Sequence, residues 1–218
     1  MRFTIARVLL ILWVTATGCT IGSQQRNTDE AITHVKQGRD LYREGDLDGA
    51  IAEYRTGLRL DPNNVKAHYN LGNALWTTGD ENGAIVEYRT ALRLDPSHVS
   101  AHTNLGVVLR KKGDGDGAIA EYRAALRLDP NNVKAHYNLG NALWTKGDEN
   151  GAIAEYRTAL RLDPAHISAH NNLGTALHAR GKTTDTTEQS TEVLRLLPDT
   201  AADQNDLGFV RQQVRELR

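Results

Sequence analysis

Val65-Lys-Ala-His-Tyr-Asn-Leu-Gly-Asn-Ala-Leu-Trp76 recurs without a change at residues 133–144. Between Val65–Pro96 and its second copy, which ends at Pro164, only two positions differ. All five prolines of the chain share one step of 34 residues, at positions 62, 96, 130, 164 and 198. The two copies lie two such steps apart. A fixed period of this length is typical of a repeat architecture, in which similar units stack along the chain.

Each unit of the repeat reads as two amphipathic helices joined by a tight turn. In the first helix of the second repeat the apolar side chains follow one helical stripe: Ala67, Leu71, Ala74 and Leu75. The second helix continues the pattern with Ala84, Ile85, Tyr88 and Leu92. Gly72 allows close approach of a neighbour, Gly79 suits a left-handed helix end, and Asp80 can cap the following helix. Pro96 then prevents the second helix from continuing.

These positions resemble the signature of the tetratricopeptide repeat (TPR) family, whose unit is a pair of antiparallel helices. In the second repeat the matching residues are Leu71, Gly72, Leu75, Ala84, Tyr88, Ala91 and Pro96. The resemblance implies an all-α fold, an α-solenoid of antiparallel helix pairs. It divides the chain into repeats at residues 31–64, 65–98, 99–132, 133–166 and 167–200.

The fifth repeat, residues 167–200, departs most from this pattern. Thr186 and Ser190 stand where the family has Ala and Tyr, and Lys182 stands where the other repeats have a capping Asp. We therefore expect a degenerate repeat whose second helix is the least stable element of the array. Residues 201–218 are predicted to add a helix that caps the last repeat.

The first residues have the order of features found in a secretory signal peptide. Arg2 and Arg7 form a short, positively charged n-region, the apolar run Val8–Val14 follows, and small residues lead to Cys19. The apolar run is shorter than the roughly 20 residues that a transmembrane helix needs. We therefore predict a signal peptide over residues 1–18.

Ala16-Thr17-Gly18-Cys19 resembles the lipobox of bacterial lipoproteins, in which the Cys is acylated with fatty acids such as palmitate. The resemblance implies a lipidated Cys19 at the start of a polar tether over residues 19–30. Thr20 stands where Asp would signal retention in the inner membrane, so it implies a lipid anchor in the outer membrane of the cell envelope, facing the periplasm. A secreted protein without lipid and an uncleaved anchor are the alternatives.

Charge and cysteine content exclude several classes of function. Lys and Arg total 26 and Asp and Glu total 27, so the chain has no basic excess for binding nucleic acid. The single Cys excludes an intramolecular disulfide framework and a thiolate metal cluster.

Two further patterns resemble ligand sites, one for phosphate and one for a metal ion, but each also has a purely structural explanation. Ala176–Thr183 satisfies a loose phosphate-loop pattern, but the repeat register places its first residues inside a helix, where the backbone amides are already bonded. The pairs His98/His102 and His166/His170 have the spacing of metal ligands on one helical face, but no acid or Cys completes either set. The alternative is imidazole packing at the repeat junctions. No nucleophile, base and orienting group recur together, so the sequence predicts neither enzymatic activity nor a cofactor.

The inner surface, which first helices line in TPR proteins, is the predicted site of function. Two residue sets share one face of their helices: Lys66, Tyr69, Asn70, Asn73 and Trp76, and Lys134, Tyr137, Asn138, Asn141 and Trp144. A periodic asparagine row consists of Asn70, Asn104, Asn138 and Asn172. It resembles the asparagine ladder of O-linked N-acetylglucosamine transferases, which holds an extended peptide by its backbone. Ordinary TPR consensus is the alternative explanation for the row.

Two other surfaces offer alternatives to this ladder. The carboxylate clamp of chaperone-tail-binding TPR proteins is matched by Asn73, Asn104 and Lys134, but Tyr69 and Asn138 replace its basic residues. A row of arginines follows the second helices: Arg55, Arg59, Arg89, Arg93, Arg123, Arg127, Arg157 and Arg161. Glutamates lie close to this row in the sequence, which favours a solvated face of mixed charge over a contact with lipid headgroups or a partner protein.

The sequence as a whole therefore predicts a membrane-tethered, non-catalytic scaffold that binds a protein or an extended peptide. Similar TPR lipoproteins support the assembly of pili, secretins or outer-membrane proteins. The alternative is a regulatory or substrate-recruiting subunit of an enzyme such as a glycosyltransferase encoded nearby. Neither prediction includes a nucleic acid or a small-molecule substrate.

Overall fold

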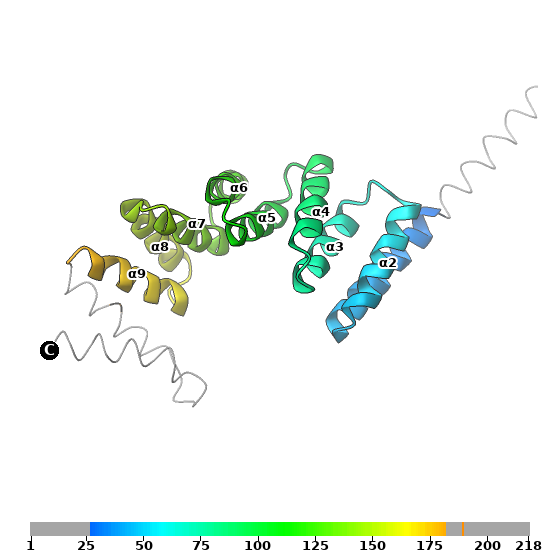
Figure 1. The fold of residues 1–218 in the computed structure, drawn as a ribbon, viewed down its shortest axis with the longest axis horizontal. Helices are drawn as coiled ribbons and strands as arrows, with labels where there is room; N and C mark the ends of the chain where they lie inside the picture. The colour runs from blue at the N-terminus through cyan, green and yellow to red at the C-terminus, as the bar shows by residue number, and fades with distance from the viewer. Residues whose placement is uncertain (1–26, 182–188, 190–218) are drawn as a thin grey trace, which may run out of the picture. The chain divides into compact units, whose positions relative to one another are not determined.

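The computed structural model describes residues 27–181 and Gln189 (Figure 1). A helix covers residues 27–44, and the next helices are α2 (Leu47–Leu60), α3 (Val65–Thr77), α4 (Glu81–Leu94), α5 (Val99–Lys111), α6 (Gly115–Leu128), α7 (Val133–Thr145), α8 (Glu149–Leu162) and α9 (Ile167–Ala179). The all-α fold of consecutively packed helix pairs is thereby confirmed. The predicted signal peptide, Cys19, the second helix of the fifth repeat apart from Gln189, and the capping helix lie outside the described residues.

The chain forms two compact units, unit 1 (Met1–Pro96) and unit 2 (Ser97–Arg218). In unit 1, α3 packs against α4 and against the preceding helix α2. In unit 2, α5 pairs with α6 and α7 pairs with α8. The first helices of successive repeats also contact one another there, because α7 touches both α5 and α9.

In each of the first four repeats, a tyrosine of the second helix packs directly on a glycine of the first helix. Four tyrosines of the second helices are at most 1% exposed: Tyr54, Tyr88, Tyr122 and Tyr156. A Cβ atom added to Gly72 would lie 2.7 Å from a ring carbon of Tyr88, and one added to Gly140 would lie 2.6 Å from Tyr156. The small residue is therefore required for the close approach that the sequence predicted.

The turn between the helices has the predicted Gly-Asp geometry. Gly79 has a φ of 89°, and its N–H donates to the carbonyl of Trp76 at 3.1 Å. The N–H of Asp80 donates to the carbonyl of Leu75, which completes a Schellman motif. Asp80 Oδ1 then accepts a hydrogen bond from the N–H of Gly83 at 2.8 Å and caps α4. Asp46, Asp114 and Asp148 cap their helices in the same way.

The two near-identical pairs, α3–α4 and α7–α8, also begin alike. Asn64 caps α3 by accepting a hydrogen bond from the N–H of Ala67 at 3.0 Å. Asn132 caps α7 by accepting one from the N–H of Ala135 at the same distance. Identical sequence has therefore given identical local structure in both units.

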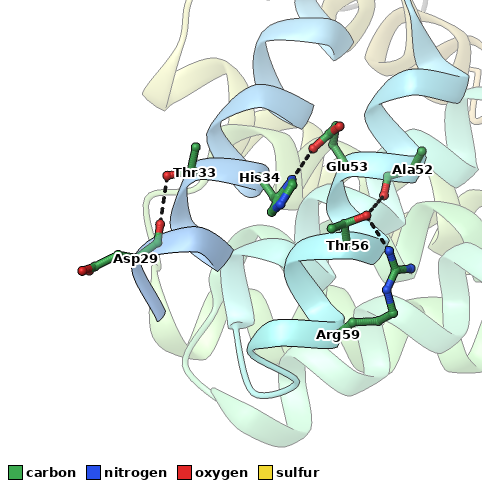
Figure 2. Close-up of polar contacts among 7 residues, drawn as sticks. All are labelled: Asp29, Thr33, His34, Ala52, Glu53, Thr56 and Arg59. Atoms are coloured by element: carbon green, nitrogen blue, oxygen red, sulfur yellow. Dashed lines mark hydrogen bonds and ion pairs between the residues drawn. The ribbon is translucent and has the colours of Figure 1, made fainter. Parts of the chain in front are cut away.

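Residues 27–30 are helical and continuous with the helix predicted from Ala31, so the last residues of the predicted tether are helical. Thr33 Oγ1 donates to the carbonyl of Asp29 at 2.9 Å (Figure 2). The tether prediction rested on the lack of an apolar period in these residues, which does not exclude a polar turn of helix.

A histidine–glutamate pair links the two helices of each of the first four repeats. In every case the imidazole Nδ1 lies 2.6 Å from a carboxylate oxygen, in the pairs His34–Glu53, His68–Glu87, His102–Glu121 and His136–Glu155. Figure 2 shows the first of these pairs. The glutamates were expected on the solvated arginine face, whereas they are half-buried and bonded to the first helix.

The hydrogen bonds of His68 raise its pKa. The bond to Glu87 is the largest cause, burial opposes it, and the carbonyl of Pro62 adds to the rise by accepting from Nε2 at 3.0 Å. In the fifth repeat the same position differs, because His170 Nδ1 faces the neutral amide oxygen of Gln189 at 2.7 Å. The repeated histidines are thus polar links between helices as well as packed rings.

Candidate peptide-binding surface

In unit 1 the predicted residues of α3 fall into two groups. Tyr88 Oη donates to Asn73 Oδ1 at 2.7 Å, and the Tyr88 ring lies 6.1 Å from the ring of Tyr69. Lys66 and Asn70 line a separate cavity of about 340 Å³, together with residues of the first helix. Trp76 is half-buried near the end of α3.

In unit 2 the predicted residues are bonded across neighbouring repeats. Lys134 Nζ, at the start of α7, donates to Asn104 Oδ1 of α5 at 3.0 Å. Asn172 Nδ2, on α9, donates to Asn141 Oδ1 of α7 at 2.8 Å and to the hydroxyl of Tyr137 at 3.3 Å. These contacts make α5, α7 and α9 one connected polar surface.

A cavity of about 220 Å³ opens on this surface of unit 2. Its lining residues are Arg110, Asn141, Trp144, Thr145, Tyr156, Asn172 and Thr175. The sequence predicted Asn141, Trp144 and Asn172 as site residues, but it did not predict Arg110. Arg110 stands in the third repeat at the position that Trp76 and Trp144 have in the second and fourth repeats. A comparison of the repeats for positions that differ from one another could therefore have found it.

The four members of the asparagine row have different surroundings. Asn138 is only 8% exposed, whereas Asn70, Asn104 and Asn172 are half-buried. Asn104 accepts a hydrogen bond from Lys134, and Asn172 donates two. The periodic row is therefore not chemically uniform, and its role as a ladder remains a prediction.

The buried tyrosines beneath this surface are neutral. Burial raises the pKa of Tyr156 to about 12, and it does the same for Tyr122 in spite of the nearby Arg110 guanidinium. Tyr156 Oη donates to Asn141 Oδ1 at 2.8 Å. Tyr122 Oη has no hydrogen-bond partner of regular geometry in the described part of the chain, because Val107 stands where the second and fourth repeats have Asn73 and Asn141.

Two of the histidines with metal-ligand spacing cap helices. His98 and His166 cap α5 and α9, where Nδ1 accepts from the N–H groups of Ala101 and Ala169 at 3.2 Å. Within residues 27–181 and Gln189, no three His, Cys, Asp or Glu side chains are placed to hold a metal ion.

The first residues of the phosphate-loop pattern and the arginine row lie on helices. Ala176–Ala179 of the phosphate-loop pattern lies inside α9, and its Lys182 and Thr183 lie outside the described residues. The eight arginines of the second helices are all exposed. One of them, Arg59, donates to Thr56 Oγ1 at 2.7 Å (Figure 2). In the described residues no helix has the length and apolar character needed to cross a membrane.

Comparison with known proteins adds a family match and several similar folds. A family model described as TPR repeat matches residues 38–79, 78–113, 108–147 and 145–181. MamA (residues 41 to the end) from Desulfovibrio magneticus RS-1 is 26% identical with a TM-score of 0.72, over 77% of this chain and 95% of that one. YrrB, described as a TPR protein with an unusual peptide-binding site, is 24% identical with a TM-score of 0.67, over 80% and 90%. PilF of Pseudomonas aeruginosa is 18% identical with a TM-score of 0.73, over 88% and 90%. No curated protein matches the sequence.

Proposed function

Because this chain belongs to the tetratricopeptide-repeat family, we propose that it is a non-catalytic scaffold that holds a partner protein along its first helices. Repeat arrays of this kind generally serve as surfaces for protein interaction. The observation that carries the proposal is the connected surface of α5, α7 and α9, where polar side chains surround a cavity of about 220 Å³. Amide side chains can donate to and accept from a peptide backbone at once, so such a surface suits an extended segment.

Site-specific photocross-linking tests this proposal. A photoreactive phenylalanine analogue at Trp144 of α7 should cross-link to a partner protein in intact cells. The matched control places the same analogue at Arg161, which is exposed on α8 of the same repeat. A second pair, Trp76 and Arg93, repeats the comparison in unit 1. Cross-links only from Arg161 and Arg93, or from none of the four positions, would contradict binding along the first helices.

The proposal includes a lipid anchor at Cys19. It rests on the leader order of charge, apolar run and small residues, and on the absence of any other Cys in the sequence. Cys19→Ser should abolish metabolic labelling with a radioactive fatty acid and leave the unprocessed precursor. Val8→Arg, a change in the apolar run, should also block processing through failed export. Label retained by Cys19→Ser would exclude the anchor.

The proposal also places the scaffold in the cell envelope, where assembly of envelope complexes is its proposed role. A lipid at Cys19 would hold the array in the outer membrane facing the periplasm, where it would assist the assembly of a pilus, a secretin or outer-membrane proteins. The alternative, a recruiting subunit for an enzyme encoded nearby, uses the same surface. Identification of the cross-linked partner by mass spectrometry distinguishes an assembly component from an enzyme.

A further inference from the structure

The hydroxyl groups that line the cavity of unit 2 already use their hydrogens within the protein. Thr145 Oγ1 donates to the carbonyl of Asn141 at 2.9 Å. Thr175 Oγ1 donates to the carbonyl of Asn171 at 3.0 Å. Tyr156 Oη donates to Asn141 Oδ1. These groups therefore have no hydrogen left to offer a ligand.

The nitrogen groups of the same cavity remain available. Asn141 Oδ1 accepts hydrogen bonds from both Tyr156 and Asn172, which fixes the amide and leaves Nδ2 as a donor. Neither Asn141 Nδ2 nor Trp144 Nε1 has a hydrogen-bond partner among the residues that the structure describes. The cavity thus presents N–H donors to whatever enters it.

The charge of the cavity is positive. Arg110 lines it, is exposed, and forms no ion pair within the described ranges. None of the other lining residues is acidic.

We infer that this cavity binds the carboxylate of an acidic side chain, Asp or Glu, in the partner segment. The inference rests on the proposed function, since the acidic residue belongs to the segment held along α5, α7 and α9. The fork of the Arg110 guanidinium matches the two oxygens of a carboxylate, and Asn141 Nδ2 and Trp144 Nε1 supply further donors. The indole of Trp144 also gives apolar contact to the methylene groups of a glutamate.

A carboxylate fits the cavity better than a phosphate group. A single guanidinium lines the cavity, which balances the single negative charge of a carboxylate. A phosphorylated side chain carries about −1.5 to −2 charges and would keep an unbalanced excess there.

The first repeat shows which residue can replace Arg110 without disturbing the packing. Tyr42 stands two repeats before Arg110, and its hydroxyl lies 2.9 Å from Thr77 Oγ1, the counterpart of Thr145. Arg110→Tyr therefore introduces the residue that unit 1 already accommodates at the equivalent position. It removes the charge and leaves a side chain that the repeat can pack.

The first test is selection of peptides from a displayed library of random 12-residue sequences by the purified full chain. The wild type should enrich peptides with Asp or Glu at a fixed distance from an apolar residue, and Arg110→Tyr should lose this preference. Enriched peptides without an acidic preference would overturn the carboxylate site alone. A failure to enrich any peptide would overturn the proposed peptide binding as well.

The second test measures the coupling between Arg110 and the acidic residue. For the most enriched peptide, Glu→Gln should weaken binding to the wild type about tenfold in fluorescence anisotropy, whereas Arg110→Tyr should bind both peptides equally. Arg127→Tyr, an exposed change on α6, is the control and should keep the tenfold difference. Tighter binding of a phosphoserine version than of the glutamate version, or an undiminished difference in Arg110→Tyr, would overturn the inference.

Discussion

Tyr156→Ala is expected to lower the free energy of unfolding by about 3–5 kcal/mol, as is typical when a large buried aromatic side chain is truncated. The ring is 1% exposed, fills the space above Gly140 and lies 6.2 Å from the ring of Tyr137. Its loss opens a cavity between α7 and α8 and removes a hydrogen bond to Asn141. Urea denaturation followed by circular dichroism measures the loss, and hydrogen exchange should show it concentrated in α7 and α8.

Two phenylalanine variants separate the ring from its hydroxyl. Tyr156→Phe loses only the hydrogen bond to Asn141 and should cost about 1 kcal/mol. Tyr122→Phe should cost nothing measurable, because the Tyr122 hydroxyl has no regular partner in the described residues. An equal cost in both variants would show that Arg110 bonds the Tyr122 hydroxyl in solution and would contradict this contrast.

Replacement of the whole asparagine row by alanine is expected to weaken partner binding by about a hundredfold or more. The half-buried Asn70, Asn104 and Asn172 each contribute about 0.5–1.5 kcal/mol if the amide bonds the partner backbone, or about 3 kcal/mol together, and every 1.4 kcal/mol is a factor of ten. Fluorescence anisotropy with a selected peptide measures the effect, once circular dichroism and the melting temperature show that the variant is folded.

The matched control for the row replaces Asn63 and Asn131, which are exposed between helices. This double variant should bind as the wild type does. Among the single variants, Asn138→Ala should affect stability more than binding, because only 8% of Asn138 is exposed. Wild-type binding by the fourfold variant would mean that the row is repeat consensus and that the partner contacts other residues.

The sequence predicted the helix pairs well because each repeat contains the information for its own fold. The apolar stripe of Leu71 and Leu75, the close contact of Gly72 with Tyr88 and the Asp80 cap depend on residues of a single repeat. Such contacts recur at every period, so one pattern predicts them all.

The contacts that the sequence did not predict join different helices or depart from the repeat. The bond between Asn141 and Asn172 crosses from one repeat to the next, and its geometry follows from how α7 and α9 pack. The His68–Glu87 bond lies within one repeat and recurs in the first four, but each of its residues alone fits a simpler role, so the repeat pattern did not indicate that the two are bonded. Arg110 was missed because it interrupts the pattern on which the site prediction was based.

The identical sequences around the N-termini of α3 and α7 allow recombination between the two copies in the gene. Asn64 and Asn132 both follow Pro-Asn and both precede Val-Lys-Ala, so a recombination between the two copies would remove residues 65–132 and restore the same junction. The shortened protein would place α7 after α2, and the α7 sequence is identical to the α3 sequence that packs there now. Such an event would create no new kind of contact at the junction. A gene of this structure can therefore vary the length of its binding surface by gain or loss of copies, while point mutation adjusts single positions such as Arg110.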